Sequence, residues 1–189
     1  THTERFSKLI AGKEQTATLT IEVSPAERGS GNSVTSLVGT DLLPEAMREA
    51  ALRGLESSLG GGIQYGYPCI DISVKLTSVE FDPDTASEFA YEAAASMAFD
   101  KACSNAAPVM LEPVMRIDIM APKDFIGEVV SGMTMRGGIV QEIESRPAVE
   151  HIHAQAPLEK MFGYSTALRS TTQGRGTFAM EFSHFQQKV

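Results

Sequence analysis

Apolar and polar residues alternate along several segments of the first half of the chain, which is the pattern of strands with one buried face. The strands predicted in this way span 19–24, 34–38 and 70–77. From Met47 to Leu59, apolar residues instead recur every fourth position, which predicts an amphipathic helix. This helix is expected to begin at Pro44, because a fixed φ and a missing N–H suit a first helical position, and to end at the glycines of 60–62.

A second helix is predicted after the polar bend at 82–84 and is expected to run to about residue 102. Thr85 and Glu88 have the spacing of a capping box at its first turn. The apolar stripe expected to face the core consists of Phe89, Ala93 and Met97.

The second half of the chain repeats this alternation in the order strand–helix–strand–strand–helix–strand, which is typical of a split βαβ, ferredoxin-like domain. Its strands are predicted at 115–119, 139–144, 149–155 and 178–182, and its helices from Pro122 and over 158–171. A run of small residues at 104–108 ends in proline and predicts a linker. The domains are therefore expected to be 1–106 and 107–189, both α+β.

The composition of the 189 residues is that of a globular chain, with 42% hydrophobic residues and a formal charge of -8. An apolar run of about 20 residues, which a membrane span needs, is absent from the sequence. The two cysteines, Cys69 and Cys103, are too few for a disulfide framework and indicate a reducing, cytoplasmic compartment. The acidic balance argues against a free-standing nucleic-acid binder. The excess of acidic residues is unevenly distributed, however: residues 1–106 carry 8 basic and 15 acidic groups, whereas residues 107–189 carry 8 basic and 9 acidic groups.

Motifs of an autonomous enzyme are missing from the sequence. The nearest approach to a phosphate-binding P-loop is Gly12-Lys13, with Ser7 in place of the first glycine and Glu14 in place of the hydroxyl residue. No catalytic residue is assigned, and the chain itself is not expected to be an enzyme.

Two pairs of polar residues are considered as sites. His151 and His153 lie two apart on a predicted strand and so face one side, a spacing that suits a metal. No cysteine ligand lies nearby, so a half-buried strand face is the favoured interpretation and no metal is expected. Asp82 and Asp84 have the residue types of an acid–base pair, but a bend before a helix favours carboxylates without any catalytic role.

One basic segment stands out in the second half. Residues 160–176 contain Lys160, Arg169 and Arg175 and no acidic residue. In Gly174-Arg175-Gly176 the arginine lies between residues without side chains, which suits a close approach to RNA phosphates. A solvated helix end followed by a turn explains the same residues equally well.

Residues 157–176, PLEKMFGYSTALRSTTQGRG, closely resemble the last helix and the following turn of domain V of elongation factor G, the translational GTPase that drives translocation on the ribosome. Residues 111–115 are similar to the family's domain V entry strand, and 66–71 to its last domain IV strand. The resemblance implies a C-terminal fragment, with the GTPase domain and its GTP and Mg upstream. It also implies that domain IV has a ribosomal-protein-like split βαβ fold with a left-handed crossover.

The resemblance further implies two ribosomal contacts. Domain IV would reach the small-subunit decoding region beside the tRNA–mRNA duplex, and domain V would lie on large-subunit rRNA near the sarcin-ricin loop and the stalk base. The residues that this assigns to rRNA contact are Arg136, Arg169, Thr172, Gln173 and Arg175.

The two tip loops of domain IV depart from the family pattern. The first, at 8–16, retains only Gly12 and Lys13 of a glycine-rich loop with an arginine, and the second, at 77–84, has Asp82 near the place of a histidine, with Asp84 beside it. The second tip is more similar to second-type elongation factors G, some of which split ribosomes with ribosome recycling factor. Translocation is the leading hypothesis. The alternatives are recycling and, in another class, a ferredoxin-like regulatory module that binds a small metabolite.

Overall fold

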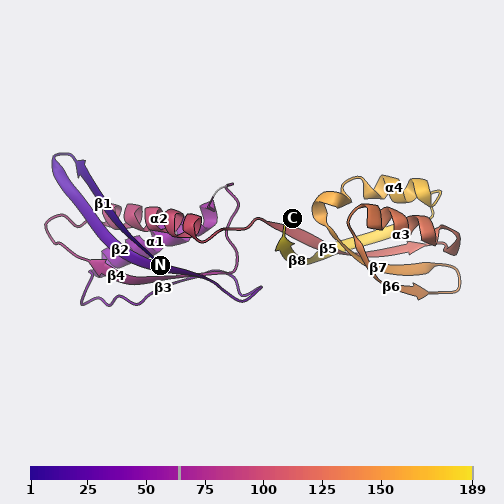
Figure 1. Cartoon of the computed structure of the whole chain (residues 1–189), viewed down its shortest axis with the longest axis horizontal. Coiled ribbons are helices and arrows are strands. Elements are labelled where there is room, and N and C mark those ends of the chain that lie inside the picture. Colours follow the sequence, from indigo (N-terminus) through magenta and orange to yellow (C-terminus); the bar gives the residue numbers. More distant parts are fainter. Residues whose placement is uncertain (64, 189) are drawn as a thin grey trace. The chain divides into compact units, whose positions relative to one another are not determined.

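The computed structural model describes residues 1–63 and 65–188, which divide into two compact units, Thr1–Pro108 and Val109–Val189. The boundary expected from the sequence, between 106 and 107, falls two residues earlier. Each unit has its own four-stranded sheet and its own core, and each is described here by itself (Figure 1).

Unit 1 packs two helices on one sheet. Its elements are β1 (His2–Ile10), β2 (Lys13–Pro25), β3 (Ser33–Ser36), α1 (Glu45–Gly61), β4 (Ile72–Glu80) and α2 (Glu88–Asn105). The strand order is β1-β2-β4-β3, with β3 parallel to β4 and the other pairs antiparallel. Since α1 joins strands that are direct neighbours, no third strand splits the βαβ crossover of this unit.

Two predictions for unit 1 are wrong at the level of strands. Strand β1 was not predicted, and the segment 8–16, expected to be a loop, consists of the ends of β1 and β2 and the turn between them. The segment 66–71, compared above with a strand, precedes β4 without strand structure. The helix α1 agrees with its prediction to within a residue at either end.

The start and the buried face of α2 also differ from the prediction. The helix is capped by Ser87, whose Oγ accepts a hydrogen bond from the Ala90 N–H at 3.1 Å, and not by Thr85. Phe89 and Met97 are 53% and 39% exposed, so the predicted stripe does not face the core. Phe89 instead packs edge-on against Phe6 of β1, with ring centroids 5.8 Å apart.

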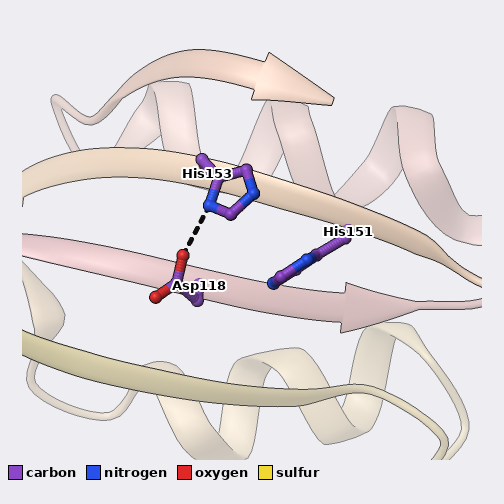
Figure 2. Close-up of side chains that lie close together, drawn as sticks. All are labelled: Asp118, His151 and His153. Atoms are coloured by element: carbon purple, nitrogen blue, oxygen red, sulfur yellow. Dashed lines mark hydrogen bonds and ion pairs between the residues drawn. The ribbon is translucent and has the colours of Figure 1, made fainter. Parts of the chain in front are cut away.

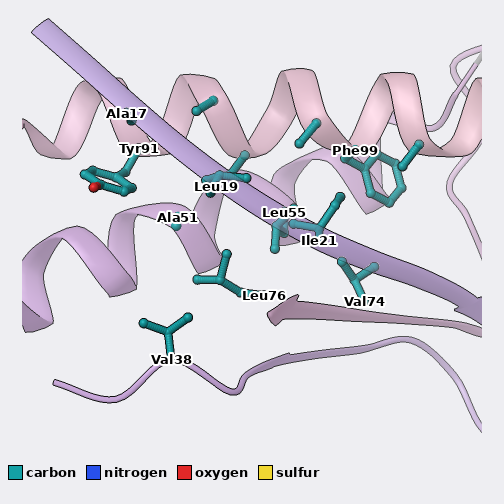
Figure 3. Packing of buried hydrophobic residues seen from close by; sticks show 14 of the residues in the cluster. Ala17, Leu19, Ile21, Val38, Ala51, Leu55, Val74, Leu76, Tyr91 and Phe99 are labelled. Carbon is teal, nitrogen blue, oxygen red and sulfur yellow. The ribbon is translucent and has the colours of Figure 1, made fainter. Parts of the chain in front are cut away.

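The core of unit 1 is built where the sheet meets a small-residue face of α2. Strands β2 and β4 contribute apolar side chains, α2 contributes Tyr91 and Phe99 (Figure 3), and the buried positions between these two are alanines. Small residues let α1 and α2 approach closely: a Cβ on Gly54 of α1 would lie 2.5 Å from the carbonyl oxygen of Glu92 of α2. The fully buried aliphatic residues of the strands are Leu19, Ile21, Val74 and Leu76.

Unit 2 has the ferredoxin-like fold that the sequence predicts. Its elements are β5 (Leu111–Ala121), the 3-10 turn η1 (Lys123–Phe125), α3 (Ile126–Met135), β6 (Ile139–Ser145), β7 (Glu150–Pro157), η2 (Leu158–Met161), α4 (Tyr164–Thr171) and β8 (Thr177–Gln187). The sheet is antiparallel in the order β6-β7-β5-β8, so each helix joins strands that a third strand separates.

Each strand of unit 2 turns one face towards the helices and one away from them. In β7, Ile152, Ala154 and Ala156 are buried, while His151 and His153 on the other face are only half-buried. The helix predicted over 158–171 is shorter than expected, because residue Gly163 adopts φ 75° and separates η2 from α4. In neither unit does any helix of the described residues have the length and hydrophobicity to cross a membrane.

Candidate functional site

The turn that follows α4 is the candidate RNA-contact site of unit 2. It leaves the helix through two left-handed residues, Gln173 at φ 52° and Gly174 at φ 79°. The Gly174 N–H donates to the carbonyl of Arg169 at 2.7 Å, which is the six-to-one hydrogen bond of a Schellman motif. The Arg175 N–H then donates to the Thr172 carbonyl at 3.0 Å. These bonds give the turn one defined backbone path.

Thr172 is buried inside this turn and does not lie on its surface. Its hydroxyl donates to the Leu168 carbonyl at 2.7 Å and accepts the Gly176 N–H at 2.7 Å. A Cβ on Gly176 would lie 2.7 Å from the same hydroxyl oxygen, so any larger residue at position 176 would force Thr172 or the turn to shift. The assignment of Thr172 to direct RNA contact is therefore corrected: its side chain holds the turn from within.

The two arginines and the glutamine of the turn are exposed. The guanidinium of Arg175 lies over the ring of Phe125, 4.8 Å from its centroid, and this cation–π contact orients it without burying its charge. Arg169 occupies the last turn of α4, where the helix dipole stabilises a cation. Arg169, Gln173 and Arg175 are thus held on a defined, solvent-exposed surface that carries N–H donors.

Arg136 has internal partners. It donates to the carbonyls of Lys160 at 2.7 Å and Phe162 at 3.3 Å, and its guanidinium lies 5.4 Å from the centroid of the Tyr164 ring. Burial raises the pKa of Tyr164 to about 12. Arg136 therefore fastens the end of α3 to the corner before α4, and it adds to the candidate surface chiefly by positioning that corner.

The first candidate tip of unit 1 is the two-residue turn between β1 and β2. Ala11 and Gly12 have φ of 49° and 79°, the pair of positive values that a type I′ hairpin turn requires. Lys13 follows directly and is exposed. Three residues further along β2, Thr16 contacts the second tip, so Lys13 projects roughly 10 Å beyond that contact at about 3.3 Å per residue.

The second candidate tip connects β4 to α2 at the same end of unit 1 (Figure 1). It is fastened to β2 by the hydroxyls of Thr16 and Thr85, 2.6 Å apart, and by the Thr16 N–H, which donates to the Thr85 carbonyl at 2.9 Å. Asp82 organises the loop, since its carboxylate accepts from the Asp84 N–H at 3.0 Å and the Thr85 hydroxyl at 3.1 Å. Both Asp82 and Asp84 remain exposed, so this tip is negatively charged.

Comparison with known proteins identifies both units. Residues 1–107 match the family described as elongation factor G, domain IV, and residues 109–188 match the family described as elongation factor G C-terminus. Two consecutive α+β domains without a P-loop, matched in this order, define the class as the C-terminal part of a translation factor. The chain belongs to the elongation factor G family.

Individual relatives agree with this family. The chain is 52% identical over 197 residues to Elongation factor G 1 of Treponema denticola and 41% identical over 192 residues to Elongation factor G 2 of Treponema pallidum, with 100% and 97% of the chain covered. A crystal structure of a protein from Thermus thermophilus superposes on 98% of the chain with a TM-score of 0.87 at 27% identity. The chain spans 29%, 28% and 28% of these three proteins.

Proposed function

We propose that the chain is the ribosome-binding arm of a translational GTPase that promotes tRNA–mRNA translocation. The observation that carries this proposal is the turn after α4, where Arg169, Gln173 and Arg175 are exposed on a backbone path fixed by Thr172. Arginine donors on a fixed backbone suit phosphate contact, which positions a protein on nucleic acid without reading its sequence. GTP and Mg would be held by the part of the protein that precedes this chain, and the chain itself performs no catalysis.

The two units would serve two parts of the ribosome. Unit 2 would place its arginine turn on large-subunit rRNA near the sarcin-ricin loop and the stalk base. Unit 1 would extend its two tips towards the small-subunit decoding region and the tRNA–mRNA duplex. The projecting turn at Ala11-Gly12 supports this role, because a hairpin with paired strands up to its last residue transmits a displacement of the arm to Lys13.

Ribosome binding of the full-length protein tests the proposal. Arg169→Ala and Arg175→Ala should each weaken ribosome binding. Each should also make the slope of log K against log salt concentration shallower, by about 0.7 to 0.9 per lost phosphate contact. Arg116→Ala is the matched control, because Arg116 lies on a strand of the same unit and pairs with Glu181. Unchanged affinity and salt slope in both turn variants would refute the assignment of the turn.

A second function is favoured by the charge of the second tip. Asp82 and Asp84 place two carboxylates where RNA phosphates would repel them, and a tip of this kind suits a paralogue that splits ribosomes with ribosome recycling factor. Single-round translocation and subunit splitting should therefore be measured on the same full-length protein. Splitting without translocation would establish recycling and overturn the leading proposal.

The remaining alternative, a free-standing regulatory module for a small metabolite, has less support. Both units match consecutive parts of one translation factor. A free-standing ferredoxin-like regulatory module would account for unit 2 alone and would leave the match of unit 1 unexplained.

A further inference from the structure

The outer face of the unit 2 sheet, away from its helices, brings together three side chains that the proposed function does not use. His151 and His153 lie on this face of β7, and Asp118 lies opposite His153 on β5. Figure 2 shows the carboxylate of Asp118 pointing towards the ring of His153, with the His151 ring beside them. The sequence reveals the two histidines but not Asp118, because only the cross-strand register places it there.

The three side chains converge at the spacing of metal ligands. One donor atom from each of Asp118, His151 and His153 lies within 4.8 Å of the others. His153 Nδ1 and Asp118 Oδ1 are 2.6 Å apart, and the histidine ring centroids are 4.3 Å apart. Ligands about 2.1 Å from a tetrahedral zinc ion lie roughly 3.4 Å from one another, so small side-chain rotations suffice.

We propose that Asp118, His151 and His153 form a binding site for a divalent zinc-class ion. The ion would lie between His153 Nδ1 and Asp118 Oδ1 in place of their hydrogen bond, with one nitrogen of His151 as the third ligand. Two imidazoles and one carboxylate are a donor set that zinc accepts, with its fourth position left to water or to another oxygen. This site is independent of the RNA-contact turn.

Charged residues lie on the far side of the His153 ring, since Glu144 faces Nε2 whereas Asp118 faces Nδ1, so the fourth position of the ion is left to water. Glu144 of β6 places Oε1 3.7 Å from His153 Nε2 and Oε2 4.0 Å from His151 Nδ1. Arg146 contacts Glu144 at 3.2 Å and His151 Nδ1 at 3.4 Å, and it would turn outward as the ion enters. The side chains of Asp118, His151 and His153 are 35%, 19% and 27% exposed, so an ion reaches them from solvent.

Occupation of the site would link the central strands of the sheet. Asp118 belongs to β5 and both histidines to β7, so one ion would add a crosslink to the ladder between them. A ligand that binds only the folded state stabilises it in proportion to the logarithm of its free concentration once that concentration exceeds the Kd. Zinc would therefore raise the thermal unfolding temperature of unit 2.

Calorimetric titration of the 189-residue chain with zinc chloride tests the proposal. We expect one ion per chain in the wild type and at least about a tenfold loss of affinity in His153→Ala and in Asp118→Asn, since even residues that only support metal ligands contribute about 10–100-fold. His184→Ala is the matched control, because His184 lies on β8 of the same unit and hydrogen-bonds to Ser183. Asp118→Asn preserves the side-chain shape and guards against a folding defect.

Cobalt(II) absorption identifies the ligands independently. A tetrahedral visible spectrum without a sulfur-to-cobalt band, lost in His153→Ala, would support the site. In the zinc titrations, three results would overturn the proposal: no zinc binding by the wild type, wild-type affinity in both Asp118→Asn and His153→Ala, or loss of binding only in a variant of His2, which pairs with Glu4 in unit 1. A sulfur band would assign the ion to Cys69 or Cys103 and would also overturn it.

Discussion

Thr172→Val isolates the buried hydroxyl that closes the turn after α4. Valine has nearly the same shape as threonine but lacks the Oγ1 atom that accepts the Gly176 N–H and donates to the Leu168 carbonyl. The Leu168 carbonyl keeps a partner, because the Thr172 N–H also donates to it at 2.9 Å. The substitution therefore leaves one donor, the Gly176 N–H, without its partner in a buried position.

The magnitude follows from that single orphaned donor. An unsatisfied buried N–H costs about 1 to 3 kcal/mol. Because the Gly176 N–H is buried, we take the middle of that range, about 2 kcal/mol. This value corresponds to about a 30-fold larger equilibrium constant for unfolding. The turn should loosen before the rest of the unit does, because the sheet and the helix-facing core keep their contacts.

Amide hydrogen exchange measured by NMR reads this effect directly, together with urea denaturation of the chain. In Thr172→Val the Gly176 amide should exchange much faster and the unfolding midpoint of unit 2 should fall. Thr171→Val is the control, since Thr171 is only partly buried and its hydroxyl makes no hydrogen bond within the described part of the chain. Equal Gly176 protection and equal midpoints in Thr172→Val and wild type would refute the role assigned to this hydroxyl.

Three further outcomes are expected from the same structure. Gly176→Ala should destabilise unit 2 by about 1–3 kcal/mol in thermal unfolding, because the new Cβ would meet Thr172. Gly127→Ala in α3 is the control, since a Cβ there would lie in open space. Equal destabilisation by the two substitutions would contradict the steric argument. The N–H groups of Gly29 and Gly31 lower the pKa of Asp71 below its ordinary 3.8, so this carboxylate adds stability at neutral pH that is lost as pH falls through the lowered value. Asp71→Asn should therefore flatten the acid limb of the stability curve, and an unchanged limb would argue against it. Burial raises the pKa of the Cys103 thiol to about 12, so mass spectrometry should find it unalkylated by iodoacetamide until the chain is unfolded; rapid native alkylation would show that the core opens.

Much of the fold follows from periodicity, and the errors have physical causes. Strands β2 and β4 were predicted because their apolar residues alternate cleanly. Strand β1 was missed because it lies at the sheet edge, where Glu4 is its only buried residue and no apolar alternation develops. Helical spacing predicts that Phe89 and Met97 face the core. They lie outside it, because α1 and α2 approach closely enough to bury the alanines of α2 instead.

The candidate sites divide in the same way. The exposure of Arg169 and Arg175 could be anticipated, because an acid-free basic segment next to glycines is a surface pattern. The burial of Thr172 could not, since it depends on a turn that folds back over its own helix. The position of Asp118 likewise depends on the pairing of β5 with β7, whose facing residues Asp118 and His153 are 35 positions apart in the sequence.

The distribution of charge within unit 2 makes an acidic chain compatible with the proposed RNA partner. The four strands carry six acidic residues and one basic residue, while the helices, turns and connecting segments carry three acidic and seven basic residues. A phosphate group is therefore attracted to the turns and repelled by the sheet, and a divalent cation experiences the reverse. The net charge of -8 averages over this separation, and in unit 1 it averages over two tips of opposite sign, Lys13 on the hairpin and Asp82 with Asp84 on the loop. What -8 excludes is tight binding to RNA in any orientation. The proposed role, in which the arm binds the ribosome and is released again, would need that exclusion as much as it needs the arginine turn.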